Sequence, residues 1–255
     1  MNVIQERLSA LRALMKEQGM DAYLVPTADY HETEYVGEHF KCRKYITGFT
    51  GSSGTAVVTM DQACLWTDGR YFVQASHELE GSSVTMMKMG HEGVPEVEEY
   101  LDQKLPAGGC LGFDGRVVNA AAGLNLEDLL EDRNIRISYG EDLIGKIWED
   151  RPALSAQPAW VLAPHFEGEC SRDKMADVRE ARKKAHATVH VLTTLDDIAW
   201  LLNIRGDDIL YNPVVLSYVV LTMDQLYLFI NEDVIDGKAY PYLDNTDDTT
   251  TREYL

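Results

Sequence analysis

Three glycines stand three residues apart in YITGFTGSSG, residues 45–54, with a threonine and two serines among them. A loop of this composition is able to cradle a phosphate through its backbone amides, but the spacing of Gly48, Gly51 and Gly54 fits neither G-x-G-x-x-G nor the P-loop pattern. The loop also leads into TAVVTM, a strand-like run, rather than into a helix whose first amides would face an anion. The glycines therefore predict a turn that requires positive φ and close backbone approach.

The stretch WTDGRY, residues 66–71, is the second candidate for chemistry. Asp68 and Gly69 form a typical turn pair at the end of a predicted strand, from which Arg70 and Tyr71 can project. One interpretation is structural: Asp68 caps the following helix and Arg70 is a solvated charge. The other is functional, because a planar guanidinium suits a peptide carboxylate or carbonyl. The residues alone leave both open.

Two histidine-containing stretches are candidates for metal sites. His186 and His190 are four apart in HATVH, but Ala187 stands where H-E-x-x-H has glutamate, and the surrounding TVHVLTT favours a strand. HETEYVGEH, residues 31–39, is rich in His and Glu but has no spacing that aims these groups at one point. Neither stretch predicts a metal site.

Cys42 lies among basic residues, which would lower its pKa and make the thiol more reactive. The neighbours are Lys41, Arg43 and Lys44. No catalytic triad is identifiable around Cys42 from the sequence. We therefore assign it no catalytic role.

Charge and cysteine usage limit the partners and the compartment. The chain has 23 Lys and Arg against 42 Asp and Glu, a net charge of −19, which disfavours nucleic acid and anionic membrane surfaces. Its four cysteines are widely separated and form no C-x-x-C pair, and residues 1–19 have the spacing of an amphipathic helix rather than an export signal. These features predict a cytoplasmic protein with reduced thiols and with no membrane or nucleic-acid partner.

The pattern of elements predicts an α/β fold. After the first helix, AYLVP is a buried strand, and TAVVTM and ACLWT form a hairpin around Asp61 and Gln62. Helical and strand-like segments then alternate as far as IRIS, residues 135–138, which indicates a mixed sheet covered by helices.

The same order begins again after a proline-bracketed polar stretch between Pro152 and Pro158. We therefore predict a first domain at residues 1–157 and a second at residues 158–255. Met-Asp-Gln joins both predicted hairpins, at residues 60–62 and 223–225, which suggests an internal duplication. The second copy is shorter and ends in YPYLDNTDDTTTREYL, a polar stretch expected to supply no further helices or strands. The second domain is thus expected to be truncated.

Four long motifs resemble the N-terminal part of Xaa-Pro aminopeptidase (aminopeptidase P) in its long, three-domain form. They are YITGFTGSSGTAVVT, LWTDGRYFVQA, IWEDRPALSAQP and TTLDDIAWLLNIRGDDILYNPVVLSYVVL. The resemblance covers nearly the whole chain. It implies two related creatinase-type N-terminal domains, each a mixed β-sheet covered by helices, with the catalytic "pita-bread" domain absent from this sequence.

The resemblance also implies an activity for the parent protein. Such enzymes remove the residue before proline from short peptides, using two divalent metals, typically manganese, held in the missing catalytic domain. The residues here would be inactive alone, with no catalytic or metal-ligating residue, and would restrict the cleft to short peptides. Arg70 resembles a residue that contacts bound peptide, with Asp68, Gly69 and Tyr71 as its supports. The expected partners are peptides with proline at the second position, the missing domain and a second copy in a homodimer.

A second class of function stays open at this point. The fold also resembles N-terminal domains of pseudo-peptidases, which bind peptides or histones without cutting them. A stand-alone module of this kind would use the acidity of the chain to bind basic proteins. Coding sequence beyond Leu255 would separate the two hypotheses.

Overall fold

The structure is a computed structural model that describes residues 2–235, 239–244, 249–252 and 254. It divides into two compact units. Unit 1 comprises residues 1–30 and 38–152, and unit 2 comprises residues 31–37 and 153–255. The chain thus leaves unit 1 at Pro152, while the sequence-based boundary after residue 157 stays a prediction.

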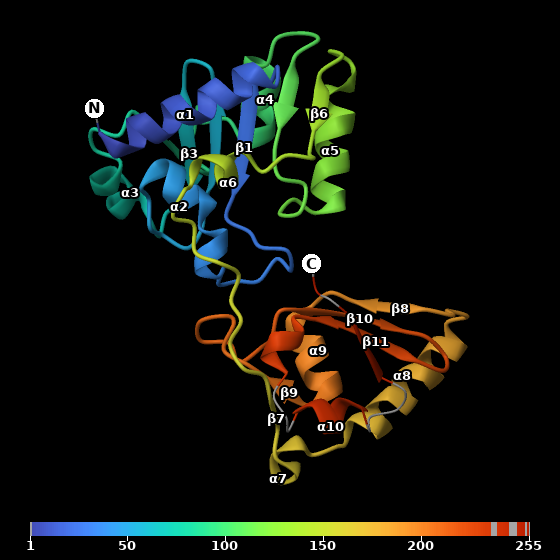
Figure 1. Cartoon of the computed structure of the whole chain (residues 1–255). Helices are drawn as coiled ribbons and strands as arrows, with labels where there is room; N and C mark the ends of the chain where they lie inside the picture. The colour runs from blue at the N-terminus through green and yellow to red at the C-terminus, as the bar shows by residue number, and fades with distance from the viewer. Residues whose placement is uncertain (1, 236–238, 245–248, 253, 255) are drawn as a thin grey trace. The chain divides into compact units, whose positions relative to one another are not determined.

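A six-stranded mixed sheet with the order β4-β3-β2-β1-β5-β6 forms the centre of unit 1 (Figure 1). Strand β2 is antiparallel to β1 and β3, whereas the other neighbouring strands are parallel. All strands but β2 therefore end at one edge, which we call the carboxyl edge. The strands are β1 (Ala22–Pro26), β2 (Thr55–Thr59), β3 (Ala63–Thr67), β4 (Thr85–Lys88), β5 (Cys110–Gly112) and β6 (Arg136–Ser138).

Helices cover both faces of this sheet. Helices α1 (Val3–Glu17), α2 (Cys42–Thr47), α3 (Phe72–Glu78) and α6 (Leu143–Ile147) contribute to one core, and α4 (Val97–Lys104) and α5 (Ala120–Glu131) to the other. Successive residues of β1 alternate between the two cores, with Tyr23 and Val25 in the first and Ala22 and Leu24 in the second. Because both faces are buried, strands β1 to β3 are almost continuously apolar.

Unit 2 contains a four-stranded sheet with the order β12-β11-β10-β8. Its strands are β8 (His190–Leu192), β10 (Ser217–Leu221), β11 (Leu226–Ile230) and β12 (Thr249–Arg252). Unit 2 also contains the helices α8 (Ser171–Lys184), α9 (Leu195–Leu202) and α10 (Ala239–Asp244). A second, two-stranded sheet consists of β7 (Trp160–Val161) and β9 (Ile204–Arg205). Two short helical segments are α7 (Pro164–Glu167) and η2 (Glu232–Val234). In unit 1, η1 (Glu38–Phe40) precedes α2.

The expectation of no secondary structure in the last residues was wrong. Residues 239–244 form α10, and residues 249–252 form β12, which pairs in parallel with β11. Leu243 is 2% exposed, so the segment has an apolar anchor that its Asp- and Thr-rich composition conceals. Backbone pairing with β11 then holds the polar residues in a strand.

The predicted duplication is visible in the hairpins. In unit 1 the Thr59 amide donates to the Gln62 carbonyl (2.9 Å), and in unit 2 the Thr222 amide donates to the Gln225 carbonyl (2.8 Å). The threonine hydroxyl accepts from the glutamine amide in both turns. The four-residue sequence Thr-Met-Asp-Gln therefore builds the same turn twice. None of the helices in the described part of the chain is long and apolar enough to span a membrane.

Candidate functional site

Asp68 and Arg70 form a compact ion pair where β3 ends at the carboxyl edge of unit 1. One oxygen of Asp68 accepts from the Arg70 backbone amide (3.0 Å) and Nε (2.8 Å), and the other accepts from Nη2 (2.8 Å). These hydrogen bonds hold the pKa of the Asp68 carboxyl well below its usual range. The bidentate geometry fixes the plane of an exposed guanidinium, which is the group suited to bind carboxylates and carbonyls.

The proposal that Asp68 caps the following helix is wrong. Helix α3 begins at Phe72, its N-cap residue is Tyr71, and no side chain makes the cap hydrogen bond. Asp68 instead closes a turn onto Arg70. Arg70 is a surface charge, with 68% of its side chain exposed, but Asp68 restricts its orientation.

The glycine loop turns the chain as predicted. Gly48 has φ of +81° and ends helix α2 in the left-handed conformation. A Cβ on Gly51 would lie 2.2 Å from the Phe49 ring, and one on Gly54 would lie 2.8 Å from the Trp66 carbonyl oxygen. The loop leads into β2, and its glycines are needed for conformation and close packing.

Tyr71 connects this loop to the Asp68–Arg70 turn. Its hydroxyl lies 2.7 Å from the Ser52 hydroxyl, and its ring packs edge-on against Phe49 with the centroids 5.8 Å apart. The guanidinium of Arg70 lies 5.2 Å from the centre of the same ring. Tyr71 therefore contacts both segments, and its role as a support for a peptide contact stays a prediction.

Arg43 is a buried anchor that the sequence reasoning missed. It is 4% exposed, donates from Nη1 to the Phe49 carbonyl (2.5 Å) and from Nη2 to the Gly51 carbonyl, and donates from Nε to the Thr27 hydroxyl (3.0 Å). Burial lowers its pKa to about 10. Arg43 thus ties the glycine loop to the residue that follows β1, although its position beside Cys42 suggested only a basic neighbour.

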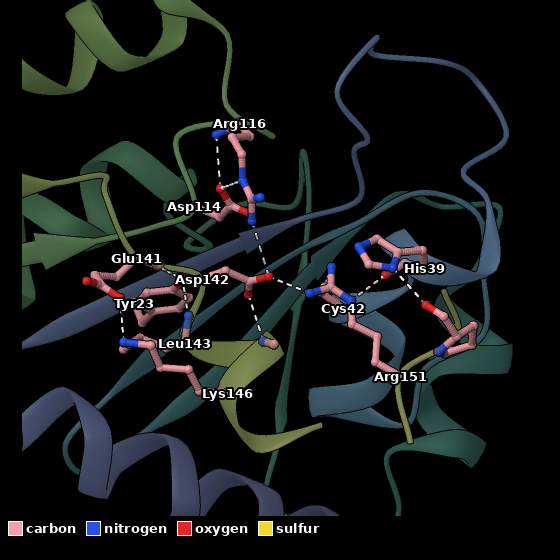
Figure 2. Close-up of polar contacts among 12 residues, drawn as sticks. Tyr23, His39, Cys42, Asp114, Arg116, Glu141, Asp142, Leu143, Lys146 and Arg151 are labelled. Atoms are coloured by element: carbon pink, nitrogen blue, oxygen red, sulfur yellow. Dashed lines mark hydrogen bonds and ion pairs between the residues drawn. The ribbon is translucent and has the colours of Figure 1, made fainter. Parts of the chain in front are cut away.

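A second Asp-Gly-Arg turn lies at the carboxyl edge after β5, as Figure 2 shows. Asp114 accepts from the Arg116 backbone amide (3.0 Å), Nε (2.9 Å) and Nη2 (2.9 Å), the same three bonds that join Asp68 and Arg70. Arg116 also lies 3.5 Å from Asp142, which pairs with Arg151. The tripeptide Asp-Gly-Arg occurs at both positions in the sequence, and this repeat would have predicted the second turn.

The expectation of an activated Cys42 thiol was wrong. Burial raises the pKa of Cys42 to about 12, and the nearby Arg151 only partly offsets this effect. Arg151 donates toward the Cys42 sulfur (3.4 Å) as well as to Asp142. The cavity between these residues and the end of β1 has about 20 Å³, enough for about one water molecule. This charged cluster is therefore a packing feature rather than a substrate pocket.

The two histidine-containing stretches do not converge on a metal site. His186 follows the end of α8 in a left-handed conformation, and His190 begins β8. Within the ranges that the structure describes, no three His, Cys, Asp or Glu side chains are grouped so as to hold a metal ion.

Two family models cover the chain almost end to end. The creatinase/prolidase N-terminal domain matches residues 7–141, and a second model with the same description matches residues 150–255. The chain belongs to the creatinase/prolidase N-terminal domain family. Its two units are thus two members of one family in tandem, which confirms the α/β fold and the duplication predicted from the sequence.

The relatives of this creatinase/prolidase-type chain include Xaa-Pro aminopeptidases. The probable Xaa-Pro aminopeptidase P of Neurospora crassa is 38% identical over 241 residues, which is 93% of this chain and 35% of the relative. Xaa-Pro aminopeptidase 1 of Dictyostelium discoideum is 38% identical over 245 residues, 92% of this chain and 39% of the relative. The chain therefore spans less than two fifths of the length of these relatives.

A solved structure agrees with these matches. The X-prolyl aminopeptidase of Caenorhabditis elegans, described as a cytosolic enzyme with a di-nuclear active site, superposes with a TM-score of 0.92 at 34% identity. The match covers 98% of this chain and 42% of that protein. The family resemblance drawn from the motifs is thereby confirmed.

Proposed function

We propose that this chain is the non-catalytic N-terminal portion of a metal-dependent Xaa-Pro aminopeptidase, which removes the N-terminal residue before proline. Identity of about 38% to two enzymes of that name, across more than nine tenths of the chain, carries the proposal. The two tandem domains help to shape the cleft of the longer protein and restrict it to short peptides. Hydrolysis belongs to the catalytic domain of that protein, where two divalent metal ions, manganese in this proposal, supply the chemistry.

Arg70 is the proposed peptide contact in this portion. Its guanidinium stands at the carboxyl edge of the unit 1 sheet, where α/β proteins commonly bind ligands. Asp68 fixes its plane through two side-chain hydrogen bonds, so less conformational entropy is lost when it binds. The guanidinium then donates to a carbonyl or carboxylate of the bound peptide, while Gly69 and Tyr71 support the turn.

The experiment measures hydrolysis of an Xaa-Pro tripeptide with added Mn²⁺, comparing this chain with the longer protein and with its Arg70→Ala variant. We expect activity only in the longer protein. Loss of the Arg70 contact should lower kcat/KM by about 10- to 100-fold, mainly through KM, because a hydrogen bond to a charged group is worth about 1.5–3 kcal/mol. Arg116→Ala is the matched control, since Arg116 makes the same three bonds with its own aspartate.

Two outcomes would contradict the proposal. Activity in the 255-residue chain alone would mean that it contains a complete catalytic site. A longer protein that hydrolyses no Xaa-Pro peptide would instead favour a stand-alone module for peptides or basic proteins, for which the net charge of −19 is the supporting observation. Equal losses in Arg70→Ala and Arg116→Ala would overturn the contact but leave the activity in place.

The cytoplasmic location and the homodimer are part of the same proposal. The cytosolic enzyme of C. elegans supports the first. The second rests on β8, which among the described strands pairs only with β10 and carries Val191 with 58% exposure. Sedimentation at increasing concentration should show dimers that Val191→Lys weakens. A chain that stays monomeric at all concentrations would contradict the homodimer.

A further inference from the structure

Unit 2 contains a pocket of about 340 Å³. This volume lies at the lower end of the range of small-molecule sites. The pocket is formed at the carboxyl end of β8, by the residues that follow this strand, by the segment 31–35 and by the loop before β10. Its lining consists of His31, Glu32, Thr33, Glu34, Tyr35, Thr194, Leu195, Asp196, Ile209, Tyr211 and Asn212.

The base of the pocket is apolar, whereas its rim is acidic. Leu195 and Ile209 are 1% and 3% exposed and provide an apolar base. Three acidic residues, Glu32, Glu34 and Asp196, line the same space, and the described lining contains no lysine or arginine. An apolar base below a negatively charged rim suits a ligand with an aliphatic stem and a cationic head.

Two aromatic rings add to this preference. Tyr35 and Tyr211 meet edge to face, with centroids 6.4 Å apart and planes at 84°. They are 45% and 86% exposed, so both residues are accessible to a ligand. Aromatic faces attract cations, and guanidinium groups more often than ammonium groups in proteins. The rings and the carboxylates therefore select the same sign of charge by different physical means.

The walls of the pocket are held in place by other residues of unit 2. His31 lies between the Thr193 carbonyl oxygen (2.7 Å from Nδ1) and the Tyr254 hydroxyl (2.6 Å from Nε2), and its ring packs against Tyr218. Nδ2 of Asn212 donates to Asp196 (3.3 Å) across the pocket lining. A ligand would thus meet a largely preformed site, which lowers the entropic cost of binding.

We infer that this pocket binds the cationic side chain of an arginine or lysine in a peptide segment. A metal ion is the less suitable ligand, because the carboxylates of the described lining do not gather into a group able to hold one. An anion is disfavoured by the charge of the rim. The inference does not depend on the proposed peptidase activity, since the site lies within unit 2 and binding is measured without catalysis.

The test uses the 255-residue chain and two probes of the same shape, N-acetyl-arginine amide and N-acetyl-citrulline amide. Citrulline keeps the stem and the planar head of arginine but carries no charge. Titration followed by amide NMR signals should shift Glu34, Tyr211 and Asn212 with the arginine probe. We expect the citrulline probe to bind at least about tenfold more weakly, because its head has neither the ion-pair nor the cation–π attraction.

Variants test whether binding depends on the pocket or on the overall negative charge of the chain. Glu34→Gln and Asp196→Asn remove one charge each and keep similar shapes, and the amide oxygen introduced by Asp196→Asn can still accept from Asn212. Each should weaken the arginine probe by about three- to fivefold, and Tyr211→Ala by a similar factor. Glu127→Gln, on the exposed face of α5 in unit 1, is the matched control and should change nothing.

Any of the following results would overturn the inference. The first is equal binding of the citrulline and arginine probes. The second is an equal loss in the Glu127→Gln control, or arginine-dependent shifts that map outside the pocket. The third is a response to Ca²⁺ alone at micromolar concentration with none to the arginine probe, which would make the pocket a metal site.

Discussion

The two units have the same pairing of hairpin strands, but these strands are buried to different extents. In each unit, one strand pairs antiparallel with the first strand of a hairpin that has the Thr-Met-Asp-Gln turn. The second strand of that hairpin then pairs in parallel with a further strand. Strands β2 and β3 of unit 1 are buried at nearly every position. Strands β10 and β11 of unit 2 are buried only at alternate positions. One hairpin sequence pattern thus serves both a sheet covered on two faces and a sheet covered mainly on one.

The loops that lead into the hairpins of the two units differ in length. Helices α2 and α9 each end in a left-handed residue, Gly48 and Asn203, and a glycine follows three positions later in both units. Unit 1 then enters β2 after three residues, 52–54, whereas unit 2 inserts residues 207–216 before β10. Three residues of this longer loop, Ile209, Tyr211 and Asn212, line the pocket of unit 2. The comparison shows that the framework is duplicated, and the binding groups that we propose lie in what each copy adds to it.

The largest expected loss of stability comes from substituting Gly51 and Gly206, which hold equivalent positions in the two units. Gly51→Ala places a methyl 2.2 Å from the Phe49 ring and 2.8 Å from the Tyr71 ring, so we expect a loss of about 3 kcal/mol in the free energy of unfolding of unit 1. Gly206→Ala meets a methyl of Val215 at 2.6 Å and should cost less, about 1–2 kcal/mol. Urea unfolding combined with hydrogen exchange assigns each loss to its unit.

Gly69→Ala is the control for these substitutions. Its nearest neighbour would be 3.7 Å away and its φ is not positive, so the change should be close to neutral. If Gly51→Ala and Gly69→Ala behaved alike, close packing would not be the reason for the glycine at position 51.

The second effect tests the burial of the two hairpins. Counting back from the shared turns, Val57 and Val220 hold equivalent positions on the second face of their sheets. Val57 is 0% exposed and packs in the core below α4 and α5, whereas Val220 is only partly buried. Val57→Ala should cost about 2 kcal/mol and Val220→Ala less than about 1 kcal/mol, by the same unfolding measurement. Equal costs would mean that the second face of unit 2 is as fully covered as that of unit 1.

Much of this framework was predictable from the sequence. The hairpins, the helices α1 and α8, and the repeated Met-Asp-Gln turn follow from apolar spacing and turn residues, which act over a few neighbours. The burial of Arg43 and the resulting environment of Cys42 did not follow, because they depend on carbonyl groups of a distant loop and on Arg151. Likewise, the spacing in HETEYVGEH does not reveal that residues 31–37 join unit 2.

The third effect is a pH dependence confined to unit 1. Burial lowers the pKa of His39 below 6.5, more than its hydrogen bond to the Pro152 carbonyl raises it. The unfolded chain therefore binds this proton more readily than the folded one. The stability of unit 1 should be fully present above pH 6.5 and fall as the pH decreases through the lower folded pKa.

Unfolding of unit 1 between about pH 5 and pH 8 checks this dependence, with His39→Gln as the comparison because glutamine has no titrating group. The difference between the two proteins should grow as the pH falls. A constant difference would show that His39 does not contribute to the pH dependence.

The smallest effect concerns the turn that carries Arg70. Counting on from the shared hairpin turns, Asn231 and Asp233 stand in unit 2 where Asp68 and Arg70 stand in unit 1. The Asn231 side chain accepts from the Asp233 amide at 3.0 Å, as Asp68 accepts from the Arg70 amide at 3.0 Å. In unit 2 the turn therefore forms without a guanidinium, so we expect the turn of unit 1 not to require Arg70.

Arg70→Ala should accordingly leave the fold of unit 1 intact. It should raise the pKa of Asp68 toward the ordinary value of 3.8, because the bonds from Arg70 are the main cause of its lowering, as carboxyl carbon NMR titration would show. Since the folded pKa is the lower one, the pair stabilises unit 1 above pH 3.8 and loses this effect as the pH falls further. The pair is exposed and screened by water, so we expect a loss of only about 0.2–0.5 kcal/mol. A larger loss would mean that Arg70 supports the fold, and reduced peptide turnover in the variant would then no longer identify a contact.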